Sequence, residues 1–83
     1  MKNIHNSVSD VQTHITNNHF PVVGNVKETR HDWTIVEFTN INEDLLRLEV
    51  HLGDKNACVL AQQGFTNDQR DLIMNTFMRM VFP

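Results

Sequence analysis

The C-terminal segment 66–83 constrains the fold more than any other part of the chain. Thr66 is a good helix N-cap, and Gln69 lies three residues on, as in a capping box. Apolar residues then recur densely almost to the last position. The segment therefore predicts an α-helix from 66 to about 81.

This helix is apolar over a wider sector than one core requires. A helix that faces a single core needs an apolar stripe of about 100°, whereas these side chains cover roughly half of the circumference. They are Ile73, Met74, Phe77, Met78, Met80 and Val81. Two explanations stay open: the helix packs on a sheet and is flanked by a second helix, or part of its surface meets another chain. The methionines favour adaptable packing in either case.

The middle of the chain, from Pro21 to Gln63, has the composition of β-strands. In the segment 45–52 apolar residues alternate with Arg47, Glu49 and His51, which is the pattern of a half-buried strand. Further strands are predicted around 22–26, 33–39 and 57–62, with a bulge or bend at 24–25 and a strand end and turn over 27–32. Short turns between neighbouring strands require antiparallel pairing.

A first helix is predicted over 8–17. Ser7 with Asp10 three residues later resembles a capping arrangement, and Val8, Val11 and Ile15 form one narrow helical stripe. The fold class that follows is α+β in a single domain, 1–83. It consists of a helix, a four-stranded antiparallel β-meander and a C-terminal helix, with both helices on one face of the sheet.

Strand alternation also predicts what the uncovered side of the sheet carries. Val36 and Phe38 should point toward the helices, which leaves Trp33 and Ile35 on the open side together with Arg47. An aromatic ring with an aliphatic neighbour and an arginine is the composition favoured at protein interfaces. The alternative is that Trp33 simply lies over the sheet edge.

Composition limits the class of protein. A net charge of −3 argues mildly against binding to nucleic acid or to an anionic membrane. Cys58 is the single cysteine, so no internal disulfide can form, and a reducing compartment is the simpler interpretation. Neither a signal peptide nor an apolar stretch of membrane-spanning length is visible. We expect a cytoplasmic protein with no membrane association.

No residue set predicts catalysis, a cofactor or a metal. The chain has five histidines, but the pattern of two His four apart with a Glu between them is missing. His51 could come close to Cys58 on the neighbouring strand, but a cysteine inside a strand lacks the helix N-terminus that lowers a thiol pKa. We therefore expect no enzyme.

The function predicted from these features is a small non-enzymatic protein that binds another protein as a regulator, inhibitor, adaptor or dedicated chaperone, of the size typical of phage or plasmid accessory proteins. A homodimer is also expected, formed by the final helix or by the open sheet face. The predicted binding residues are Trp33, Ile35, Arg47, Met74, Met78 and Phe82. One alternative is a single-stranded nucleic-acid-binding domain that uses the open sheet face. A second alternative is a small metal-binding protein or hydrolase.

Overall fold

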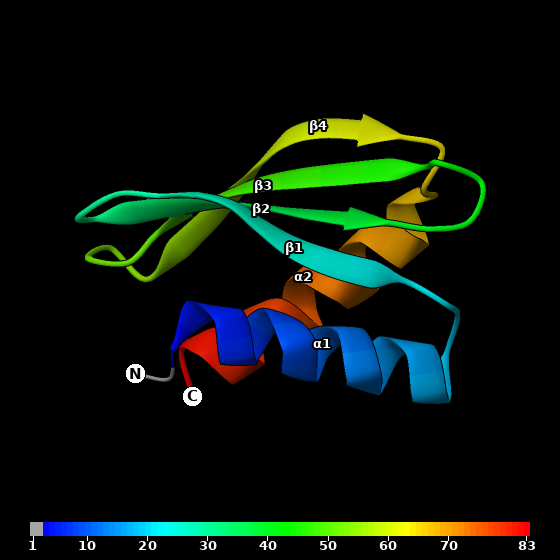
Figure 1. The fold of residues 1–83 in the computed structure, drawn as a ribbon, viewed down its shortest axis with the longest axis horizontal. Coiled ribbons are helices and arrows are strands. Elements are labelled where there is room, and N and C mark those ends of the chain that lie inside the picture. Colours follow the sequence, from blue (N-terminus) through cyan, green and yellow to red (C-terminus); the bar gives the residue numbers. More distant parts are fainter. Residues whose placement is uncertain (1–2) are drawn as a thin grey trace.

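The structure is a computed structural model that describes residues 3–83. A helix, a four-stranded antiparallel meander and a second helix follow one another along the chain (Figure 1). The elements are α1 (Ile4–Asn18), β1 (Val23–Thr29), β2 (Trp33–Thr39), β3 (Leu45–His51), β4 (Asn56–Gln63) and α2 (Asn67–Val81). Both helices lie on one side of the sheet and contact each other (Figure 1). The predicted fold class is confirmed.

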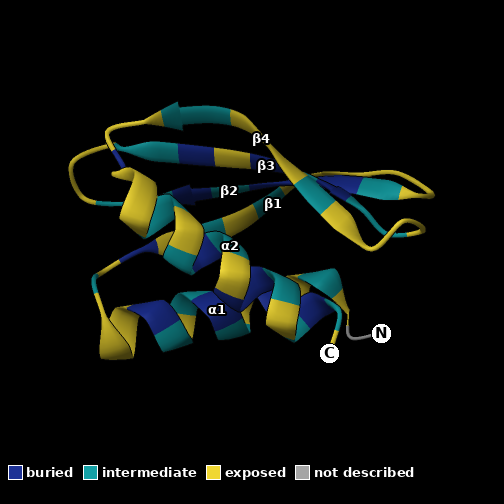
Figure 2. Cartoon of the chain, turned by 180° about the vertical axis from the view of Figure 1, so that it is seen from behind, coloured by how far each residue is buried: buried dark blue, intermediate teal, exposed yellow. Residues whose placement is uncertain are grey.

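The strands are hydrogen-bonded in the order β1-β2-β3-β4, and their register fixes which side chains face the helices. Val36 pairs with Leu48, and Phe38 pairs with Leu46; all four side chains are fully buried under the helices. Figure 2 shows the alternation along β3, where dark blue segments are separated by lighter ones, whereas β2 is buried continuously over 34–36. The facing predicted from the alternating residues is confirmed.

The N-terminal helix begins earlier than predicted. Asn3 is its N-cap, and the Asn3 Oδ1 atom accepts a hydrogen bond from the His5 amide at 2.8 Å. Ser7 was predicted as the cap but lies inside the helix, with its side chain fully buried. A Ser residue can occupy an N-cap or a position between the two ends of a helix. Ser7 takes the second position, with its side chain buried.

Helix α2 confirms the predicted capping box. The Gln69 amide donates to Thr66 Oγ1 at 3.1 Å, and the Thr66 amide donates to Gln69 Oε1 at 2.9 Å. Its buried face includes Ile73, Phe77 and Val81. The remaining apolar side chains of α2, and Phe82 just after it, are partly buried and pack against the same core; those of α2 are Leu72, Met74, Met78 and Met80. The wide apolar sector thus faces the sheet and α1 together.

Strand β1 departs from the prediction in the position of its bulge. The segment 27–32, predicted as a strand end and turn, consists of the end of β1 through Thr29 and a turn at 30–32. The bulge lies at Lys27, between Val26 and Glu28, and not at 24–25. Gly24 has a different role: a Cβ atom there would lie 2.7 Å from both Phe38 Cε1 and Val8 Cγ1, so the absent side chain lets α1 approach the sheet.

Within residues 3–83, neither helix has the length and hydropathy to cross a membrane.

Candidate functional site on the open face of the sheet

Among residues 3–83, none forms a second layer on the side of the sheet opposite the helices, and we call this side the open face (Figures 1 and 2). Its central side chains come from β2 and β3, where Trp33 lies opposite His51, and Ile35 lies opposite Glu49. Neighbouring side chains come from the two outer strands. The open face consists of Lys27, Glu28, Trp33, Ile35, Glu37, Arg47, Glu49, His51, Cys58 and Leu60.

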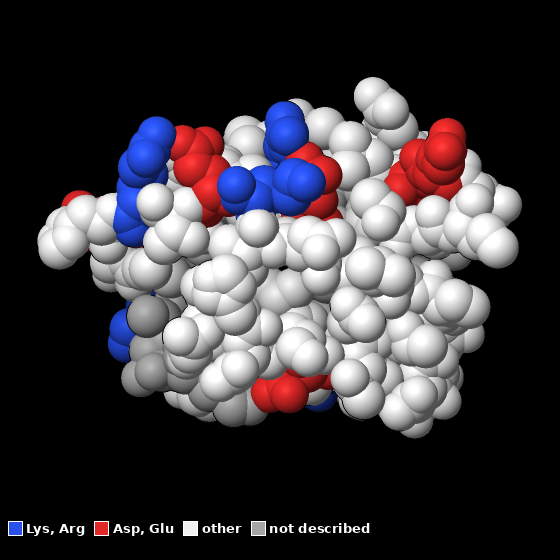
Figure 3. Space-filling view, in the orientation of Figure 1, with Lys and Arg blue, Asp and Glu red and all other residues white. Residues whose placement is uncertain are grey.

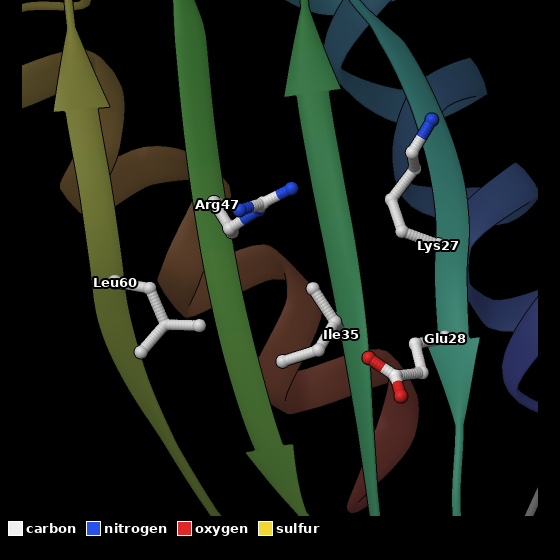
Figure 4. A pocket seen from close by; sticks show the side chains of 5 residues that line it. All are labelled: Lys27, Glu28, Ile35, Arg47 and Leu60. Carbon is white, nitrogen blue, oxygen red and sulfur yellow. The ribbon is translucent and has the colours of Figure 1, made fainter.

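A shallow depression of about 390 Å³ lies in the middle of the open face. Ile35 is only 9% exposed, whereas Leu60 is 48% exposed. The charged side chains that line the depression lie beside these two apolar residues, Arg47 on β3 and Lys27 and Glu28 on β1 (Figure 4). The depression therefore has an apolar floor and a charged rim, the arrangement that interface cores and rims share.

Acidic and basic groups alternate around this apolar centre. The Arg47 Nε and Nη2 atoms lie 2.7 and 2.6 Å from Glu37 Oε2, in a cross-strand ion pair. The Arg30 guanidinium lies over the Trp33 ring, 5.9 Å from its centroid. Figure 3 shows charged side chains of both signs gathered over the sheet, while the helix layer beneath shows few. The open face therefore presents no single sign of charge to a partner.

Three potential metal ligands meet at one end of the open face. Glu49 and His51 are two residues apart on β3, so they point to the same side, and Cys58 on β4 pairs directly with Glu49. The His51 Nε2 atom lies 2.6 Å from Glu49 Oε1, and the ligand atoms of all three side chains lie within 4.8 Å of one another. Between residues 3 and 83 this is the one such group of His, Cys, Asp or Glu.

Strand β4 is a sheet edge without charged side chains. Its eight residues, 56–63, include no charged residue and no proline. Val59 and Leu60 are 39% and 48% exposed. Both edge strands carry a bulge, at Leu60 in β4 and at Lys27 in β1, but the β1 bulge and its neighbour Glu28 are charged, which discourages edge-to-edge pairing. The two edges of the sheet are therefore chemically different.

The structure separates the predicted binding residues into two groups. Trp33, Ile35 and Arg47 lie together on the open face, where Trp33 is partly buried and Arg47 is exposed. Met74 and Met78 are partly buried on α2, on the other side of the sheet, as is Phe82 just after it. A role of either group in protein binding stays a prediction.

Two features of the site were not predicted from the sequence. Alternation predicts Glu49 and His51 on the open face, but the approach of their ligand atoms and that of Cys58 to within 4.8 Å of one another was not predicted. The uncharged edge is visible directly in the sequence of β4, once that strand is known to be the last of the meander.

No protein-family model, curated protein or solved structure matches this chain.

Proposed function

We propose that this protein is a small non-enzymatic protein-binding module and that a second copy of the chain pairs with the β4 edge. The observation that carries the proposal is an eight-residue edge strand without a charged side chain. Such an edge exposes unpaired backbone N–H and C=O groups, which serve as a template for another strand. Leu60 belongs both to this edge and to the apolar floor of the open face.

Edge pairing is favoured over contact between two open faces. Face-to-face packing would take Lys27, Glu28 and Arg47 out of water, and the desolvation penalty for each ion is several kcal/mol. Edge pairing leaves these side chains in water. It adds backbone hydrogen bonds that contribute about 1 kcal/mol each.

A two-fold axis fits this pairing, because antiparallel β4 strands present the same surface to each other. An axis near the middle of β4 brings Val59 and Leu60 of the two copies together and buries their exposed apolar surface. The two sheets then join into one continuous sheet. Its open face carries Trp33, Ile35 and Arg47 from each copy, which doubles the surface that a further protein can contact.

Light scattering on a size-exclusion column, run over a concentration series, tests the pairing. We expect the unmodified protein to form a dimer and Leu60→Lys to remain a monomer, because a charged side chain protects an edge strand. Val23→Lys is the matched control, since Val23 is 49% exposed on the opposite edge strand β1. Circular dichroism of each variant establishes that the fold is retained.

Three results would overturn the proposal. The unmodified protein could stay a monomer at every concentration, the dimer could survive Leu60→Lys, or Val23→Lys could dissociate it. A double variant, Met78→Gln with Phe82→Gln, separates the edge from the C-terminal helix. If the helix forms the interface, this variant dissociates while Leu60→Lys does not.

Single-stranded nucleic acid is the less favoured ligand for the open face. Glu28, Glu37 and Glu49 stand beside the basic side chains and would repel phosphates. Binding to nucleic acid would weaken steeply with added salt, because it releases counterions. Titration of an oligonucleotide at low and at moderate salt distinguishes this alternative from protein binding.

A further inference from the structure

We propose that Glu49, His51 and Cys58 form a binding site for a borderline transition-metal ion such as Zn²⁺, with three protein ligands and a fourth position open to water. The proposal goes beyond protein binding and does not depend on a dimer. It rests on three side chains of different chemistry that two adjacent strands bring to one side of the sheet.

The backbone positions the three ligands without any loop. Glu49 and Cys58 are direct partners in the β3–β4 ladder, and His51 follows Glu49 on the same side of β3. Direct cross-strand neighbours have Cβ atoms about 4.5–5.5 Å apart, and diagonal neighbours remain within reach of long side chains. The ligands therefore stand on a rigid sheet, and side-chain rotation alone can adjust them.

The separations between the ligand atoms are close to those that a tetrahedral ion requires. Bond lengths of about 2.3 Å to sulfur and about 2.0–2.1 Å to nitrogen or oxygen place tetrahedral ligand atoms about 3.3–3.6 Å apart. The present separations run from 2.6 Å, between His51 Nε2 and Glu49 Oε1, to at most 4.8 Å. Shifts of about 1 Å would therefore complete the geometry.

The donor set selects the class of metal. A thiolate and an imidazole favour Zn²⁺, Co²⁺ or Cu²⁺ over Mg²⁺ and Ca²⁺, which prefer an all-oxygen shell. On binding, the Cys58 thiol releases its proton to solvent, and the sulfur forms the metal bond as a thiolate. The ion also replaces the contact between His51 and Glu49, whose side chains are 36% and 31% exposed. An ion pair as exposed as this one contributes little to stability, so its loss opposes metal binding only weakly.

Titration of the purified full-length protein with Co²⁺, under a reductant that does not bind metal, tests the site. We expect one equivalent to produce the visible bands of tetrahedral Co²⁺ and a thiolate-to-cobalt charge-transfer band in the near ultraviolet. Zn²⁺ should displace the cobalt and remove both signals. Trp33 supplies a second readout: as the single tryptophan, directly opposite His51, its fluorescence should be quenched by bound Co²⁺.

Matched variants locate the ligands. Cys58→Ser should abolish the charge-transfer band, and His51→Ala should weaken Co²⁺ binding at least about tenfold. The control is His14→Ala. His14 lies on α1 and His19 directly after it, with their ring centroids 5.9 Å apart, so this pair of histidines could bind Co²⁺ adventitiously. The proposal is refuted if no charge-transfer band forms, if Cys58→Ser retains it, or if His14→Ala removes the binding and His51→Ala does not.

Discussion

The hydroxyl group of Thr76 allows a sharp test of how the helix layer is packed. Thr76 lies on the buried face of α2, and its Oγ1 atom has no hydrogen-bond partner within the described part of the chain. A buried hydroxyl without a partner costs about 1–3 kcal/mol of desolvation. Thr76→Val keeps the shape and the β-branched character of the side chain but removes this polar atom. We therefore expect the substitution to raise the free energy of unfolding by about 1 kcal/mol or more.

Thr34→Val is the matched control, because Thr34 is equally buried and its hydroxyl donates to the Glu28 carbonyl at 2.7 Å. The same chemical change there removes a hydrogen bond, so it should lower the free energy of unfolding by about 1 kcal/mol. The two variants should thus shift stability in opposite directions. For a domain of this size each shift corresponds to about 4–8 °C in the melting temperature.

Urea denaturation followed by circular dichroism measures both changes. A higher midpoint at an unchanged slope shows that stability itself, rather than the compactness of the denatured state, has changed. If Thr76→Val lowers the midpoint as Thr34→Val does, the Thr76 hydroxyl has a partner in solution, and the reasoning is wrong. Ser7, whose Oγ atom is likewise buried without a partner, extends the test to α1 through Ser7→Ala.

Two further predictions concern how α1 and α2 are held in place. Gly24→Ala should lower the free energy of unfolding by about 1–3 kcal/mol, because the new Cβ atom would lie 2.7 Å from Phe38 Cε1 and from Val8 Cγ1. Thermal melts measure the loss. An unchanged melting temperature would contradict the close approach of α1 to the sheet at Gly24. Thr66→Ala should cost about 1 kcal/mol by removing the cap that accepts from the Gln69 amide, whereas Thr66→Ser should restore most of it in the same assay.

The sequence predicted the fold where a short pattern suffices to determine the structure. Alternation over 45–52 fixes the faces of β3, and short turns then require a meander. The capping box at Thr66 and Gln69 is equally local, and it is present in the structure. These features depend on residues a few positions apart, so no knowledge of the tertiary packing was needed to predict them.

The sequence failed where tertiary contacts decide between similar local options. Asn3 and Ser7 are both good N-caps, and the burial of Ser7 in the helix layer places it inside α1. The β1 bulge at Lys27, rather than at 24–25, depends on how β1 pairs with β2. The wide apolar sector of α2 had two explanations from the sequence, and the structure agrees with the first, in which the sheet and α1 share that sector.

In the cluster of Glu49, His51 and Cys58, the side of the sheet on which a residue lies and its cross-strand neighbour are determined by different features of the sequence. The side of the sheet follows from parity along the strand, so a slip of two residues leaves His51 and Cys58 on the open face. Their exact neighbours follow from the length of the turn. A turn over 53–56 would place His51 directly opposite Cys58, whereas the observed pairing of His51 with Asn56 moves Glu49 to that position and His51 to the diagonal. Turn geometry thus decides which of the two β3 side chains faces Cys58 directly and which lies on the diagonal, whereas parity alone places all three on one side of the sheet.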